Sequence, residues 1–327
     1  MSDEVPLFRI VKSKRSSGGG MAVACNIAEA SRRHPDVLGD DATSRFAFVP
    51  LNWVHPRLIG RTPYVLMPQN AWPWGGEVSG LRARARRISL RALSELSMHR
   101  ALGVIRMGDL IPAHGAILGD ILPNVLDEQF ESALHTATGA PSLVGDGPGF
   151  VSIGSLTTYR GIGHLITGYA HYRAMGGTVP LVIAGPGRAP RPRDPRLMDG
   201  ITLIERSVPR AAVLATFLRA TAAVFPSSVE TTASITMLEA AATCRTLLAS
   251  DIPGHRAAPG RTRFYQCDDP LDLAQQLADI ERTSLQLPPM KADDPESSEQ
   301  RSAARRSWCD DLANRLRSAA QQSQLAT

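Results

Sequence analysis

The chain has 327 residues, of which 43% are hydrophobic and 20% are charged, a make-up typical of a folded globular protein with a substantial core. Its 36 Lys and Arg residues against 31 Asp and Glu residues leave a net charge of +5, and its four cysteines are scattered without a CxxC pair. This composition excludes a disordered chain and a collagen, and it indicates neither a disulfide scaffold nor a zinc site; the length favours two domains.

The first half of the chain alternates short apolar runs with longer segments of helical periodicity. A strand is predicted at residues 7–11, followed by a Ser-Gly loop over 16–20 and a helix over 21–33. The alternation continues with strands at 45–49, 64–67 and 103–107 and a helix between 78 and 100. The small, polar stretch from 132 to 149 is predicted to be a linker between domains.

The second half repeats this alternation of strands and helices. Strands are predicted at 150–154, 179–184, 201–203, 222–225 and 246–249, and helices at 161–175, 211–219, 232–243 and 269–281. A mobile connector is expected over 285–300, and then a helix over 300–321 whose apolar stripe (Trp308, Leu312, Leu316) must dock elsewhere. Consecutive βα units predict two doubly wound α/β domains with parallel sheets.

Three strand-to-helix turns are candidate ligand sites, because parallel sheets bind ligands at the carboxyl ends of their strands. The Gly-rich turn 16–20 is neither a GxGxxG nor a Walker loop, and it is either functional or a plain loop. The turn 154–161 combines hydroxyls with Arg160, which suits a diphosphate unless Arg160 is only a solvated residue. The turn 225–234 places Glu230 ahead of Glu239, and two such acids either hold sugar hydroxyls or are surface residues.

These residues resemble the retaining glycosyltransferases of the GT-B fold, glycosyltransferase family 4. FVSIGSLTTYRGIGHLITGY is similar to the family's phosphate-binding loop and helix, PLVIAGPG to its next strand and Gly turn, and FPSSVETTASITMLEAAATCRTLLASDIPGHR to its donor-site signature. ILPNVLDEQF and SWCDDLANRL are similar to its linker-proximal segment and closing helix. The resemblance implies Rossmann-like domains at 1–146 and 147–298 that face a central cleft, and a terminal helix, 299–327, that packs back on the first domain.

The resemblance also implies a function and roles for individual residues. It implies transfer of a sugar, with retention, from a nucleoside diphosphate sugar to an acceptor hydroxyl. Arg160 takes the place of the family's phosphate-binding Lys, Glu239 that of the acid on the ribose hydroxyls, and Glu230 that of the acid facing the donor sugar. Arg160 and Glu230 are the predicted catalytic residues, and the predicted donor-binding residues are Gly19, Gly20, Gly154, Ser155, Arg160, Thr231, Thr232, Ala233, Ser234 and Glu239.

The sequence departs from the family pattern at three places. Ser155 stands where the family has a second basic residue. Eight residues rather than seven separate Glu230 from Glu239, so that either the turn holds an insertion or Thr231 occupies the place of the first acid. After the strand at 64–67, where the family often has a His, this sequence has Gln69 and Asn70. Their side-chain amides can hydrogen-bond a sugar hydroxyl but cannot act as a general base near neutral pH.

The acceptor side is predicted from residue types alone. Gln69 and Asn70, with Trp72 and Trp74 in a Gly/Pro-rich loop, are the predicted acceptor-binding residues, because tryptophan stacks on sugar rings and amides bond to their hydroxyls. The Arg-rich segment Arg82–Arg91 has an apolar side, so it could contact an anionic membrane, bind an anionic acceptor or be a solvated face. That apolar side consists of Leu81, Ala85, Ile88, Ala92 and Leu96.

No cofactor and no metal are expected, since no DxD follows a predicted strand, and none of the eight histidines receives a catalytic role. A cytoplasmic enzyme of bacterial glycoside or natural-product biosynthesis is expected, with a small-molecule or glycan acceptor; no apolar stretch approaches the roughly 18 residues of a spanning helix. Three alternatives remain: a GT-B epimerase or phosphorylase, an inactive nucleotide-sugar-binding protein, and a nucleic-acid-modifying transferase that uses the Arg-rich segment.

Overall fold

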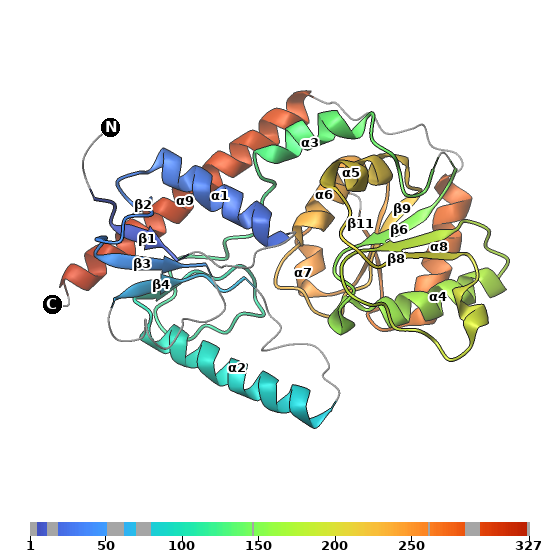
Figure 1. Ribbon diagram of the computed structural model, residues 1–327, viewed down its shortest axis with the longest axis horizontal. Helices are drawn as coiled ribbons and strands as arrows, with labels where there is room; N and C mark the ends of the chain where they lie inside the picture. Colours follow the sequence, from blue (N-terminus) through green and yellow to red (C-terminus); the bar gives the residue numbers. More distant parts are fainter. Residues whose placement is uncertain are drawn as a thin grey trace. The chain divides into compact units, whose positions relative to one another are not determined.

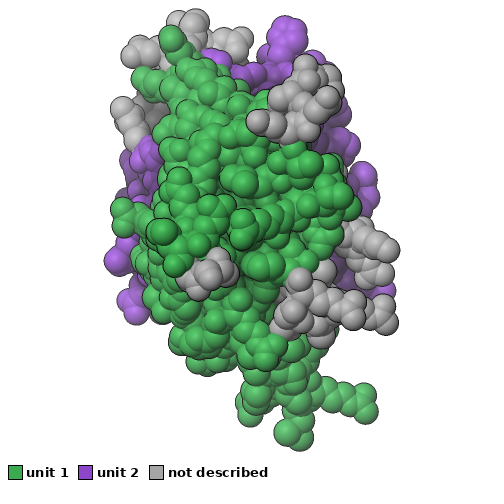
Figure 2. All heavy atoms as spheres, turned by 90° about the vertical axis from the view of Figure 1, so that its left-hand side faces the viewer, with its two compact units in different colours: residues 1–127, 299–327 green, residues 128–298 purple. Residues whose placement is uncertain are grey.

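The computed structural model describes residues 5–11, 19–50, 62–69, 80–145, 147–260, 262–284 and 295–325. The chain divides into two compact units: unit 1 comprises Met1–Asp127 and Glu299–Thr327, and unit 2 comprises Glu128–Ser298. Figure 2 shows both segments of unit 1 in green and unit 2 in purple. Each unit is built on its own parallel sheet.

Unit 1 contains, among its described residues, a five-stranded parallel sheet in the order β2-β1-β3-β4-β5. Figure 1 shows α1 on the side of β2 and α2 on the side of β4. The strands are β1 (Phe8–Ile10), β2 (Leu38–Gly39), β3 (Phe46–Val49), β4 (Tyr64–Leu66) and β5 (Gly103–Val104). The central strands β3 and β4 are buried at every residue, as their unbroken apolar sequences predict. β2 was not predicted, because two residues are too few to show a period.

The long helices among the described residues of unit 1 are α1 (Gly19–Arg33), α2 (Leu81–Arg100) and α9 (Pro295–Leu325). The stripe of α9 is buried in the core of unit 1, with Trp308 4% exposed and Leu312 and Leu316 fully buried. Trp308 Nε1 also donates a hydrogen bond to the carbonyl of Pro123 at 2.9 Å. The predicted return of the last helix to the first domain is therefore confirmed. The helix begins at Pro295, inside the predicted connector, since proline is favoured in the first helical turn.

Unit 2 contains, within the described part of the chain, a six-stranded parallel sheet in the order β11-β10-β9-β6-β7-β8. Its strands are β6 (Phe150–Ile153), β7 (Leu181–Ala184), β8 (Ile201–Ile204), β9 (Ala222–Phe225), β10 (Leu247–Ser250) and β11 (Thr262–Tyr265). The chain order reverses between β6 and β9, so the switch point of a doubly wound sheet lies there. The predicted α/β architecture is confirmed.

The helices of unit 2 are α3 (Gln129–Ala137), α4 (Ile162–Ala174), α5 (Arg210–Arg219), α6 (Ile235–Thr243), α7 (Pro253–Arg256) and α8 (Pro270–Ser284), with 3-10 turns η2 (Thr158–Arg160) and η3 (Pro195–Met198). α4 and α8 pack against each other, as Figure 1 also shows. The predicted linker 132–149 differs from the structure, because α3 lies partly within it and packs on α5. Phe130, Leu134 and Ala137 of α3 are buried. The sequence placed the boundary after residue 146, whereas the compact units meet after Asp127.

Candidate active site

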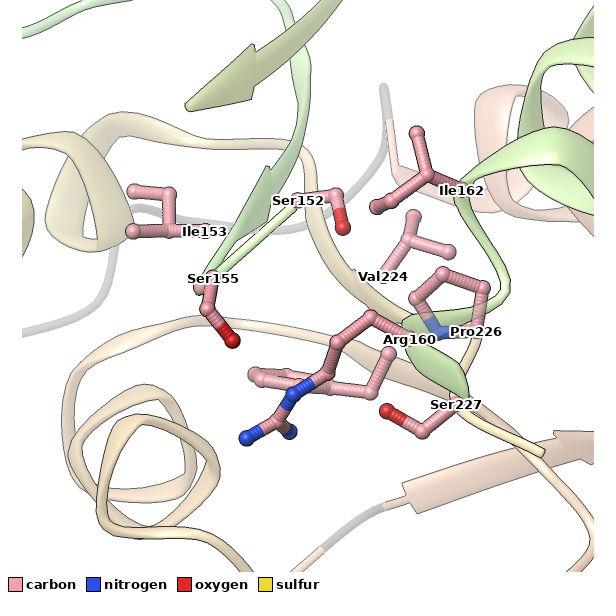
Figure 3. Close-up of a pocket in the computed structure, with 10 residues that line it drawn as sticks. Ser152, Ile153, Ser155, Arg160, Ile162, Val224, Pro226 and Ser227 are labelled. Carbon is pink, nitrogen blue, oxygen red and sulfur yellow. The ribbon is translucent and has the colours of Figure 1, made fainter. Parts of the chain in front are cut away.

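Unit 2 has a pocket at its switch point, where β6 and β9 end side by side. Its lining comes from these two strands and the turns that follow them: Ser152, Ile153, Gly154, Ser155, Arg160, Ile162, Val224, Phe225, Pro226 and Ser227. Figure 3 shows the Arg160 side chain among these residues, with its guanidinium group directed away from Ile162 and Val224. The turns at 154–161 and 225–234, predicted separately from the sequence, are thus brought together at one place where doubly wound sheets bind ligands.

Close backbone contacts hold the two turns together. Gly161 has a φ of +64°, and a Cβ added there would lie 1.8 Å from the carbonyl oxygen of Pro226. Only glycine therefore fits at this position. The backbone N–H of Ser228 donates to the carbonyl of Tyr159 at 2.9 Å, which fixes the second turn against the first.

Arg160 is the cation of the pocket. Its side chain is 24% exposed and donates from Nη1 to Oε1 of Glu230. The guanidinium also lies 5.4 Å from the ring centroid of Tyr159. Its Nε atom is buried and has no hydrogen-bond partner among the described residues. Because a buried donor without an acceptor is costly, Arg160 retains capacity for an anionic ligand.

Glu230 connects Arg160 to a second layer of polar groups. Its side chain is 11% exposed, and Oε1 also accepts a hydrogen bond of 2.9 Å from Ser227 Oγ. Loss of water raises the pKa of Glu230, while the positive charge of Arg160 acts in the opposite direction. Burial prevails, so this carboxyl group is more readily protonated than a surface glutamate.

His255 in α7 is linked to this pair through Ser250 and Ser227, and the sequence gave it no role. Ser250 Oγ donates to the carbonyl of Ser227, and His255 Nδ1 lies 2.9 Å from the carbonyl oxygen of Ser250. Burial, reinforced by the charge of Arg160, lowers the pKa of His255 to about 4. The imidazole is therefore neutral near neutral pH, with the Nδ1 proton directed at the Ser250 carbonyl. No motif marks this histidine in the sequence.

Glu239 forms a separate ion pair. It is 5% exposed on α6, and its Oε1 accepts a 2.6 Å hydrogen bond from Arg210 Nε. The guanidinium of Arg210 lies 6.0 Å from the ring centroid of Phe130 in α3. Arg210 was not predicted as a site residue, although a basic residue that begins a helix opposes the helix dipole and so gives a weak signal of a specific partner.

The other donor-side residues lie in two different settings. Thr231, Thr232 and Ala233 are buried between β9 and α6. The predicted helix start near Thr232 is wrong: α6 begins at Ile235, because Ser234 caps it by accepting a 3.3 Å hydrogen bond from the Met237 N–H. Gly154 and Ser155 line the pocket.

The predicted residues of the first domain belong to unit 1. Gly19 and Gly20 were expected in a loop, but they are the first two residues of α1. Gln69 follows β4 and is partly exposed. Asn70, Trp72 and Trp74 lie outside the described residues.

The described residues carry neither a metal-ligand cluster nor a membrane-spanning helix. No group of three or more His, Cys, Asp and Glu side chains in this part of the chain could hold a metal ion. Among the same residues, no helix combines the length and apolar character needed to cross a bilayer.

The pocket lies within the part of the chain that matches a known protein family. The family model described as Glycosyl transferases group 1 matches residues 147–282, which contain the pocket and both ion pairs. Unit 2 carries a glycosyltransferase domain of this group. A search of curated proteins finds no match. The family match confirms the resemblance drawn from the sequence, and with it the assignment of the chain as a glycosyltransferase.

Solved structures extend the likeness to both units of this glycosyltransferase. Sucrose-phosphate synthase from Thermosynechococcus elongatus is 15% identical, with a TM-score of 0.56 over 92% of this chain and 76% of that chain. An α,α-trehalose-phosphate synthase (UDP-forming) from Burkholderia vietnamiensis is 14% identical, with a TM-score of 0.56 over 94% and 78%. HepE from Anabaena, solved in complex with UDP, is 12% identical, with a TM-score of 0.53 over 98% and 99%. At these identities the likeness shows the fold, which is GT-B.

Proposed function

We propose that the protein transfers a sugar, with retention and without a metal ion, from a nucleoside diphosphate sugar to a hydroxyl of a small-molecule or glycan acceptor. The observation that carries this proposal is the pocket at the switch point of unit 2. It lies within the matched glycosyltransferase range and joins Arg160 of the phosphate-loop segment to the turn that carries Glu230. The structural neighbour HepE, whose structure contains UDP, is consistent with such a donor.

Arg160 would stabilise the diphosphate leaving group in this reaction. Breaking the bond between sugar and phosphate places negative charge on the departing oxygen, and a preorganised guanidinium lowers the cost of that charge. Arg160 is held by Glu230, and its Nε has no partner among the described residues. A phosphate oxygen could accept from this nitrogen without disrupting the ion pair.

Glu230 would act chiefly by orienting Arg160. Its Oε1 accepts from both Arg160 and Ser227, so the carboxylate faces the phosphate loop. These contacts support a positioning role for Glu230 rather than a direct role at the donor sugar, and Thr231 would then occupy the place of the family's first acid. No dedicated base is proposed, because in retaining enzymes of this type the departing phosphate oxygen can accept the proton of the acceptor hydroxyl.

Glu239 would bind the ribose hydroxyls of the donor. A carboxylate that accepts hydrogen bonds from two vicinal hydroxyls is a common means of holding a ribose, and the family resemblance gives Glu239 this place. The 2.6 Å contact from Arg210 Nε would fix the plane of the carboxylate. Gln69, Asn70, Trp72 and Trp74 remain the proposed acceptor-binding residues, and Gly19 and Gly20 remain proposed donor contacts.

The proposed setting is the cytoplasm of a bacterium, where the enzyme would contribute to glycoside or natural-product biosynthesis. The four cysteines are free thiols. The arginine-rich composition is compatible with phosphorylated substrates.

The proposal is tested by ligand-induced stabilisation followed by product analysis. The folded protein is screened with nucleoside diphosphates and their sugars, because a ligand of the native state raises the unfolding temperature. A matching donor is then incubated with and without acceptor alcohols, and the anomeric configuration of the product is determined by NMR. A glycoside of retained configuration is expected. An inverted product, or an isomerised donor formed without any acceptor, would overturn the proposal.

A further inference from the structure

Helix α2 exposes apolar side chains that a surface helix normally buries. Leu81 is 88% exposed, Ile88 69% and Leu96 42%, and Ala85 and Ala92 between them are exposed as well. The side chains that α2 does bury are Ser94, Ser97 and Met98. The half-buried Leu90 and Leu93 lie on the same side as these residues, so α2 carries apolar side chains on its outer side in addition to those that face unit 1.

Helical geometry gathers the exposed apolar residues into one stripe. With about 100° between successive residues, positions 81, 85, 88, 92 and 96 fall within a band about 80° wide. Ser94 and Ser97 lie on the opposite side of the helix by the same geometry. The stripe runs along most of α2, which Figure 1 shows at the β4 side of unit 1.

Arginines flank this stripe on both sides. Arg84 and Arg91 lie along one border, and Arg82 and Arg100 along the other. The helix holds six arginines against one glutamate, a balance of +5 that equals the net charge of the entire chain. Arg91 pairs with Glu95 at 2.8 Å, but such exposed pairs contribute little and leave the positive field in place.

We propose that α2 docks unit 1 on an anionic lipid surface. The apolar stripe would enter the boundary between headgroups and acyl chains, while the flanking arginines bind lipid phosphates. Six arginines in a helix of 20 residues favour a position along the bilayer surface.

The charge and the hydrophobicity of α2 together favour an anionic lipid surface over a nucleic acid or a second copy of the chain as its binding partner. A nucleic acid would engage the arginines but leave Leu81 and Ile88 in water. A second copy of the chain would bring one +5 helix against another, and like charges oppose such a contact. An anionic bilayer can both bury the apolar stripe and bind the arginines that flank it.

The experiment is vesicle co-sedimentation of the full-length protein. Vesicles contain phosphatidylcholine alone or with about one third phosphatidylglycerol, at low and high salt. The wild type is expected to sediment with the anionic vesicles and to be released as salt rises. The variant Leu81→Ser/Ile88→Ser/Leu96→Ser is expected to bind at least about tenfold more weakly.

A matched variant controls for general loss of exposed apolar surface. Met175→Ser/Leu271→Ser/Leu325→Ser replaces side chains that are 54%, 64% and 90% exposed outside α2. It should bind like the wild type, and unfolding temperatures verify that both variants are folded. The proposal is overturned by equal sedimentation with neutral and anionic vesicles, or by equal loss of binding in both variants. It is also overturned if vesicles do not bind and the stripe instead supports self-association or binding to duplex DNA.

Discussion

Two Arg–Glu pairs of unit 2 have the same chemistry but different surroundings. Arg160 and Glu230 join two turns beside the pocket, and their hydrogen bonds continue through Ser227. Arg210 and Glu239 join two helices, with the arginine over Phe130. The first pair is therefore suited to stabilising negative charge that develops on a ligand in the pocket. The second pair is suited to fixing the orientation of the Glu239 carboxylate. If this distinction is correct, substitutions in the first pair affect turnover, and those in the second affect ribose recognition.

The largest effect is expected from Arg160→Ala. Removing a preorganised donor for the leaving diphosphate should lower kcat by about 100-fold or more, as for other donors that stabilise developing negative charge. Turnover of the donor found by the screen is the measurement. Arg196→Ala, at a residue 86% exposed in the same unit, is the control and should be unaffected. Unchanged turnover in Arg160→Ala would contradict the idea that the Arg160–Glu230 pair acts in turnover while the Arg210–Glu239 pair acts in ribose recognition.

His255, which is linked to the first pair through Ser250 and Ser227, should make the stability of unit 2 sensitive to acid. The folded-state pKa of His255 is about 4 against an ordinary value of 6.5, so the protein is stabilised above pH 6.5 and loses that stability as the pH falls toward 4. The loss should amount to about 3 kcal/mol of unfolding free energy. Denaturant unfolding at several pH values measures it. His255→Gln should flatten the decline, whereas a decline of equal slope in this variant would contradict the assignment.

A smaller effect is expected from Glu239→Gln. If the carboxylate holds the ribose, the variant should bind the nucleoside diphosphate about tenfold more weakly, because a charge-assisted hydrogen bond is lost. Titration with the ribonucleotide and its 2′,3′-dideoxy analogue is the measurement. The wild type should prefer the ribonucleotide, and the variant should lose most of that preference. A preserved preference would place the ribose elsewhere.

The smallest effect is expected from Arg210→Met. Arg210 would act through Glu239, so nucleotide affinity should fall only about threefold for this partly exposed pair. Arg210→Lys should restore part of it. The double variant with Glu239→Gln should bind no more weakly than Glu239→Gln alone, since residues in one network are not additive. An additive loss would show that Arg210 acts independently of Glu239.

The strands of unit 2 were largely predictable because buried parallel strands are continuous apolar runs. β9 was predicted with the bounds it has in the structure, Ala222–Phe225. β11 was not, since Arg263 and Phe264 are exposed and interrupt the pattern. α3 was mistaken for part of a linker because the predicted stretch began after Phe130, which supplies the first residue of its buried stripe.

The candidate site was predictable to the extent that local motifs carry it. The segments with Arg160, Glu230 and Glu239 could be found from sequence patterns. Arg210 could not, because it lies 29 residues from Glu239 and their contact depends on the packing of α5 and α6. The exposure of the apolar stripe of α2 was also beyond the sequence, since periodicity shows a stripe but not which side of the helix faces the core.

The discontinuous make-up of unit 1 has a consequence for how the protein assembles during synthesis. Trp308, Leu312 and other side chains of α9 complete a core whose remaining side chains come from before Glu128. All of unit 2 is translated in between. Unit 2 can therefore fold before α9 has been synthesised. Until then the core of unit 1 is incomplete and its apolar side chains are exposed, so a chaperone that acts in this interval would bind unit 1.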